Sequence, residues 1–256
     1  MIDNTITREE YAKFLTGVKA VDKCFGIVYE AIKEAEIEDD SIIIFTTDHG
    51  IPYPNMKCTL YDDGTGIAFI IRYKGNKTTG KAIDTLLSNV DVFPTICGIL
   101  DLKIPDYVQG KSFLPVLNMD MDEVNSEIFS EVNYHAAYEP QRCIRTKRHK
   151  YIKRYDEDTS IVKCNIDEGE SKDFWLENNI DMLPRDREML FDLYLDPVER
   201  INLINHACYT DILNELKNKL KSWQVITNDP ILYGRPYIEG SMVMKRNSDP
   251  RKHEYE

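Results

Sequence analysis

An apolar run that ends abruptly in an aspartate–histidine pair constrains the fold of this chain more than any other feature. Residues 42–46 read Ile-Ile-Ile-Phe-Thr, Asp48 and His49 follow, and Lys57 comes a short loop later. A continuous apolar run of this kind is typical of a strand buried in a parallel sheet. In open α/β sheets, ligands bind just beyond the carboxyl ends of such strands. The pattern therefore places Asp48 and His49 where chemistry is usually carried out.

Hydrophobic periodicity predicts the other elements. A long amphipathic helix is expected over residues 11–35, because Phe14, Val18, Val21, Phe25, Val28 and Ile32 form one apolar stripe behind a capping box at residues 7–10. The remaining expectations are strands at 67–71, 127–134, 142–155 and 189–195, a short buried helix at 91–100, an amphipathic helix around 212–223, connecting loops at 103–108 and 114–120, and a frayed tail at 247–256.

The segment after the apolar run resembles a known loop. Thr-Thr-Asp-His-Gly at residues 46–50, followed by Lys57 and by Leu-Tyr-Asp at residues 60–62, resembles the metal-binding loop of the sulfatases, in the alkaline-phosphatase-like superfamily. The Gly-Ile-Pro-Tyr-Pro…Lys…Leu-Tyr form is most similar to the heparan N-sulfatase (sulfamidase) branch. Five ordered blocks extend the resemblance, at residues 11–35, 89–100, 108–115, 142–152 and 190–203.

This resemblance implies an α/β fold that corresponds to the C-terminal half of a sulfatase. A mixed sheet flanked by helices would be followed by a small antiparallel sheet with a C-terminal helix. Residues 1–120 would be the C-terminal portion of the α/β catalytic domain, with the metal-binding loop at residues 46–62. Residues 121–256 would be a smaller C-terminal subdomain.

The resemblance also assigns a metal site. Asp48 and His49 match two ligands of the single divalent cation of the family. Calcium is the family's metal and prefers oxygen ligands, whereas imidazole suits transition metals better. Manganese and zinc therefore stay open beside calcium. Judged from its residues alone, the Asp-His pair could equally be a turn that caps a strand.

Two further residues are assigned to the substrate. In the family, a cation at the position of Lys57 binds the sulfate oxygens and stabilises charge on the bridging oxygen as the ester breaks. By a looser match, His135 would contact the sugar at the mouth of the pocket, and Glu131 and Tyr138 share that assignment. The alternatives without a functional role are a solvated loop lysine and a surface histidine.

The nucleophile of the family is absent from the sequence. Sulfatases attack with a formylglycine made from the first residue of a C/S-x-P-S/A-R motif, and none of the six cysteines or the serines begins one. We expect the formylglycine only in a missing N-terminal segment, because this chain resembles the product of a truncated gene or of an internal start. The chain would then be catalytically incompetent alone. Cys58, next to Lys57, is predicted to be structural.

The composition and net charge limit the classes of partner that this chain is expected to bind. The 256 residues carry a formal net charge of −12, and an acidic protein does not steer itself toward anionic polymers. The expected partner is a sulfated carbohydrate or another sulfate ester, with no nucleic acid and no membrane. Residues 142–154 hold seven Lys or Arg and no acid, but strand alternation favours one packed and one solvated face. A cytoplasmic location is expected for the chain as given, because no signal peptide is visible.

Three alternatives accompany this reading. The Asp-His form also occurs in phosphonate monoester hydrolases of the superfamily, so a phosphomonoester or phosphonate hydrolase is the first rival. A non-catalytic sugar-binding remnant is the second. The third is a folding-deficient fragment that forms oligomers or pairs with the missing N-terminal half, because exposed strand edges promote association.

Overall fold

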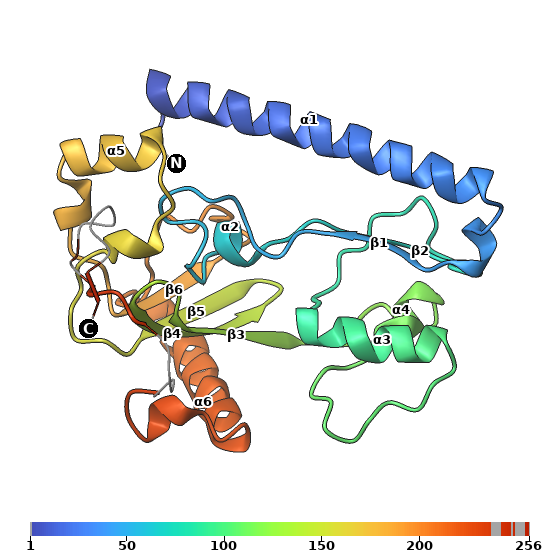
Figure 1. Cartoon of the computed structure of the whole chain (residues 1–256). Coiled ribbons are helices and arrows are strands. Elements are labelled where there is room, and N and C mark those ends of the chain that lie inside the picture. The colour runs from blue at the N-terminus through green and yellow to red at the C-terminus, as the bar shows by residue number, and fades with distance from the viewer. Residues whose placement is uncertain (1, 237–241, 247, 249–253, 256) are drawn as a thin grey trace.

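Two antiparallel sheets and six α-helices make up the described part of the chain (Figure 1). The computed structural model describes residues 2–236, 242–246, 248 and 254–255. Its elements are α1 (Thr5–Glu34), β1 (Ile43–Thr46), α2 (Asp62–Thr65), β2 (Phe69–Arg72), α3 (Val92–Ile99), α4 (Leu114–Leu117), β3 (Glu127–Tyr134), β4 (Tyr138–Thr146), β5 (His149–Arg154), α5 (Glu170–Glu177), β6 (Glu188–Asp192) and α6 (Thr210–Ile226).

Helix α1 begins earlier than the capping-box prediction placed it. Asn4 is the N-cap: its Oδ1 accepts the Thr7 backbone N–H at 2.9 Å, and the Thr7 hydroxyl accepts the Asn4 N–H at 3.2 Å. The box at residues 7–10 is therefore wrong, because Thr7 is the reciprocal third residue of a box that Asn4 opens. Asparagine is among the best N-caps, so it stabilises the earlier start.

Helix α1 lies along one side of the molecule (Figure 1), and only part of its apolar stripe is packed against the rest. The Phe14 ring packs on Tyr53, and the Phe25 ring packs edge-on against Phe45 of β1. Other aliphatic side chains of the helix face water, with exposed fractions between 48% and 71%; this α1 apolar surface consists of Val18, Val21, Ile27 and Val28.

The first sheet has two strands. β1 pairs with β2 antiparallel, with Thr46 opposite Phe69 and Ile43 opposite Arg72. The prediction of a buried parallel strand is wrong for the described residues, because β1 has this antiparallel partner and is only half-buried. Few elements pack on the faces of a two-stranded ribbon. The apolar run at residues 42–46 therefore did not lead to a fully buried strand.

The second sheet has four strands in the order β3-β4-β5-β6, all antiparallel. The single strand predicted at residues 142–155 is wrong, because the chain reverses between β4 and β5. The reversal is closed by Thr146, whose hydroxyl accepts the His149 N–H at 2.8 Å and donates to the His149 carbonyl at 3.0 Å. Such side-chain bonds offer the backbone an alternative to the ladder.

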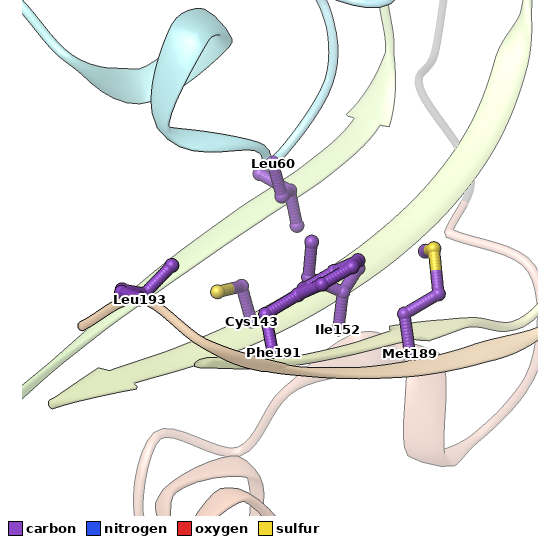
Figure 2. Packing of buried hydrophobic residues seen from close by; sticks show 6 residues of the cluster. All are labelled: Leu60, Cys143, Ile152, Met189, Phe191 and Leu193. Atoms are coloured by element: carbon purple, nitrogen blue, oxygen red, sulfur yellow. The ribbon is translucent and has the colours of Figure 1, made fainter. Parts of the chain in front are cut away.

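Both faces of the four-stranded sheet are covered. On one face, Leu216 and Leu220 of α6 pack against Ile144, Tyr151 and Leu190. On the other face, Leu60 reaches down from the loop before α2 onto a cluster of residues from β4, β5, β6 and the turn after β6, as Figure 2 shows; these are Cys143, Ile152, Met189, Phe191 and Leu193. The predicted small antiparallel sheet with a C-terminal helix is confirmed.

Other expectations differ in detail. The predicted connecting loop at 114–120 contains the short helix α4, and α5 was not predicted. Most of the predicted tail at 247–256 lies outside the described residues. Within the described part, no helix is long and apolar enough to cross a membrane.

The end of β6 gives the fold an acid-sensitive ion pair. Asp192 is 1% exposed and accepts hydrogen bonds from Arg148 and from the Tyr209 hydroxyl. The hydrogen bonds from Arg148 lower the pKa of Asp192 from 3.8 to about 2. A carboxylate whose pKa is depressed in the folded state stabilises the fold above its unfolded pKa, and that stability is lost as the pH falls through the folded value.

We expect Asp192→Asn to lower the free energy of unfolding at pH 7 by at most about 2 kcal/mol. A pKa shift of one unit corresponds to about 1.4 kcal/mol, and water partly screens the half-exposed Arg148, which reduces the effect. The difference from the wild type should shrink between about pH 4 and pH 2. Urea unfolding at several pH values measures it. A difference that stays constant from pH 7 to pH 2.5 would contradict the assignment.

Candidate functional site

A tightly folded loop, residues 47–61, joins β1 to α2 and carries three of the four predicted site residues; we call it the site loop. The Gly50 N–H donates to the Gly64 carbonyl at 3.0 Å, and the Lys57 N–H donates to the Ile51 carbonyl at 3.1 Å. A Cβ on Gly50 would lie 1.8 Å from the carbonyl oxygen of Asp63. The glycine of the Asp-His-Gly motif is therefore required by close backbone packing.

Asp48 and His49 place two atoms that can coordinate a metal ion side by side. The Nε2 of His49 lies 3.5 Å from Asp48 Oδ2, and its Nδ1 lies 2.7 Å from the Gly50 carbonyl oxygen. A carbonyl only accepts, so this contact assigns the proton of a neutral ring to Nδ1 and leaves a lone pair on Nε2. The Asp48 side chain is 88% exposed. The pair can thus offer one oxygen and one nitrogen to a common ligand.

Lys57 is held by a partner that the sequence did not reveal. Its Nζ donates to the two carboxylate oxygens of Asp167 at 2.8 and 3.1 Å, and the Lys57 side chain is 20% exposed. The hydrogen bond to Asp167 raises the pKa of Lys57, and Asp48 raises it further. Asp167 lies 110 residues away along the chain in a stretch with no motif, so no local pattern could have identified it.

His135, an exposed residue of the turn between β3 and β4, reaches the same region. Partial burial lowers its pKa, and the charges of Lys57 and His49 lower it further, while Asp167 opposes them. Two separate segments of the chain, the site loop and the turn after β3, thus bring His49 and Lys57 within electrostatic range of His135. We call Asp48, His49, Lys57, His135 and Asp167 the candidate site.

Glu131 and Tyr138, which shared the assignment of His135, have other partners. Glu131 lies 3.2 Å from the guanidinium of Arg142. The Tyr138 ring packs against Tyr134, with Arg235 over its face at 4.5 Å. The structure therefore brings His135 to the candidate site and engages these two side chains elsewhere.

A cleft of about 1420 Å³ opens next to the site loop, between β2 and strand β3. Asp48 and Cys58 line it, whereas His49, Lys57 and His135 do not. Burial raises the pKa of the Cys58 thiol to about 11, so this thiol is protonated at neutral pH, in agreement with the structural role predicted for it.

Buried charges fasten the site loop to the second sheet. Lys150 of β5 is 1% exposed; its Nζ lies 2.5 Å from Asp62 Oδ1 and 2.8 Å from Glu199 Oε1, and it donates to the Leu60 carbonyl at 3.1 Å. Arg145 donates to the same Asp62 at 2.8 Å. We call Asp62, Arg145, Lys150 and Glu199 the Lys150 cluster.

The Lys150 cluster shows that basic residues of the run at residues 142–154 are buried in ion pairs. The prediction of a packed and a solvated face holds only in part, because Arg142, Lys150 and Arg154 are all at most 3% exposed. Each is paired with a carboxylate. Much of the run is therefore neutralised inside the protein.

Comparisons with known proteins agree with the architecture. The family model described as "N-sulphoglucosamine sulphohydrolase, C-terminal" matches residues 55–183, and the model described as "Sulfatase" matches residues 2–102. An ulvan-active sulfatase of Formosa agariphila is 28% identical over 227 residues, which cover 84% of this chain and 45% of the relative. Human N-sulphoglucosamine sulphohydrolase is 24% identical over 249 residues, which cover 87% and 49%.

A solved structure, of a protein in complex with its substrate D-glucosamine-2-N,6-O-disulfate, has a TM-score of 0.66 and 23% identity to this chain. The match covers 83% of this chain and 40% of that one. The fold is thus that of the alkaline-phosphatase-like sulfatases, and the chain belongs to the sulfatase family. Within that family, its matching C-terminal model is that of N-sulphoglucosamine sulphohydrolase. The chain spans less than half the length of these relatives.

Proposed function

We propose that this chain supplies part of the catalytic site of a sulfatase that hydrolyses sulfuric esters or sulfamates of sulfated sugars. The observation that carries the proposal is that the site loop, with Asp48, His49 and Lys57, meets His135 and Asp167 from two distant segments of the chain. Two relatives, an ulvan-active sulfatase and an N-sulphoglucosamine sulphohydrolase, support sulfated sugars as the substrate class.

Asp48 and His49 would hold a divalent cation. Their oxygen and nitrogen donors fit two positions of a coordination shell, but the described residues contain no group of three or more His, Cys, Asp or Glu side chains that could hold a metal ion. Calcium, manganese and zinc all stay candidates, since an oxygen–imidazole pair excludes none of them. When bound, the cation would draw negative charge from the sulfuryl oxygens.

The remaining residues would orient the substrate. The ammonium of Lys57 would bind sulfuryl oxygens and oppose the charge that grows on the bridging oxygen. His135, exposed in its turn, would contact the sugar. The formylglycine nucleophile and the other cation ligands would come from residues that this sequence does not contain, so we expect the chain alone to have no turnover of 4-nitrophenyl sulfate.

Calorimetric titration with calcium, manganese or zinc chloride tests the cation site. One ion should bind per chain, and Asp48→Ala or His49→Ala should each weaken binding by at least about 10–100-fold, the loss seen when even an indirect partner of a metal ligand is removed. His206→Ala and Asp106→Ala, two exposed residues of the same types elsewhere, are the matched controls. Unchanged affinity in both site variants would refute the cation site.

A further inference from the structure

The ion pair between Lys57 and Asp167 bears on which anions the candidate site accepts. Lys57 is the cation that the proposed function assigns to the sulfuryl group, yet both Asp167 oxygens already lie within 3.1 Å of its ammonium. The Asp167 side chain is 35% exposed, so an arriving anion can reach it. Any anion that binds Lys57 must therefore displace this carboxylate or lie against it.

We propose that Asp167 is a specificity-determining residue, which makes the site favour singly charged ester groups over doubly charged ones. This inference rests on the proposed function and names the charge of its substrate. A sulfate ester or a sulfamate carries one negative charge, whereas a phosphate monoester carries between one and a half and two at neutral pH. Repulsion from a fixed carboxylate grows in proportion to the charge of its neighbour, so Asp167 penalises the dianion more.

The surrounding charges leave this role to Asp167. Asp48 also lies near Lys57, but it belongs to the pair assigned to the cation, which would neutralise it. Glu168, the next residue, is bonded to Lys172 at 2.7 Å and so is turned to a different cation. Asp167 is thus the carboxylate in contact with Lys57 that stays negative when the site is loaded.

The test compares two esters of one shape and different charge, 4-nitrophenyl sulfate and 4-nitrophenyl phosphate, at pH 8. Their dissociation constants are measured by NMR titration on the whole chain with the cation that binds best. We expect the wild type to prefer the sulfate, and Asp167→Asn to shift the ratio of the two constants toward the phosphate by about tenfold, the effect of one unit charge a few ångströms away. Asp167→Glu should keep the wild-type ratio.

Glu168→Gln is the matched control, since it removes one acid from the adjacent position and should leave the ratio unchanged. An Asp167→Asn variant that keeps the wild-type ratio, or tightens both esters equally, overturns the inference. Lys57→Met separates this failure from that of the proposed function. If Lys57→Met binds both esters as the wild type does, or if neither ester binds the wild type and the Asp167→Asn variant, the anion-binding role of Lys57 is itself refuted.

Discussion

Replacement of Lys150 by methionine is expected to lower the free energy of unfolding by about 3–5 kcal/mol, the range seen when one partner of a buried ion pair is removed. Methionine keeps the length and most of the volume of the side chain, so little of the loss would come from a cavity. What remains is Glu199, 3% exposed, without its cation. The loss should also loosen the site loop, because Lys150 donates to the Leu60 carbonyl.

The pH dependence of this deficit identifies its cause. Burial already raises the pKa of Glu199, so its charged form costs stability at neutral pH, and without Lys150 that cost grows. The deficit should therefore shrink as the pH falls toward the unfolded pKa of a glutamate, about 4.3, and Glu199→Gln should restore part of it at pH 7. Lys147→Met, in a half-exposed pair with Glu123, should cost at most about 1 kcal/mol. A Lys150→Met variant that loses no more than this control would argue against the cluster.

Replacement of Arg142 by methionine is expected to cost a similar amount, about 3–5 kcal/mol. Arg142 is fully buried and donates to both oxygens of Asp229 at 2.6 and 2.7 Å. Asp229 follows α6, so this fork joins the sheet to the end of that helix. Removal of the fork leaves a carboxylate that is 1% exposed, and among the described residues its remaining donors are the Gln224 side chain and the Ile231 N–H.

Chemical denaturation of three variants measures this effect. Arg142→Lys should lose less than Arg142→Met, because it keeps the charge although it loses the two-pronged geometry. Lys153, directly opposite Arg142 on β5 and half-buried, provides the control, and Lys153→Met should cost at most about 1 kcal/mol. Equal losses for Arg142→Met and Lys153→Met would show that the buried pair does not stabilise the junction.

Elements with a strong apolar period could be predicted from the sequence. Helix α6 and strand β3 match their predictions. The apolar side chains of α6 pack on one face of the sheet, and β3 packs Phe129 on that face and Val132 on the other. The hairpin at residues 147–148 could not be predicted, since the turn is closed by the side chain of Thr146 and not by glycine, proline or asparagine. The pairing of β1 was also misjudged, because an apolar run reports hydrophobicity and not the neighbour that will cover it.

Some residues of the candidate site could likewise be predicted from the sequence, and others could not. Asp48, His49 and Lys57 were predicted as a set because one short loop carries them all, and His135 followed from a looser match. Asp167 was missed because an ion pair across 110 residues leaves no periodic trace in the sequence. Glu199 of the Lys150 cluster was missed for the same reason, since its partners Lys150 and the Asp62 N–H lie in distant segments. Strand alternation in the basic run at residues 142–154 predicted one packed and one solvated face, whereas folding places acids from three distant segments against Arg142, Arg145 and Lys150. The roles of the four predicted residues remain predictions that the experiments above address.

The α1 apolar surface affects how readily molecules of this chain associate in solution. Attraction between hydrocarbon groups in water strengthens on warming from the cold, and α1 offers four branched aliphatic side chains to any neighbour that meets it. The net charge of −12 keeps molecules apart at low ionic strength, but added salt screens that repulsion. Cold, dilute buffer of low ionic strength is therefore the condition under which individual molecules should stay dispersed.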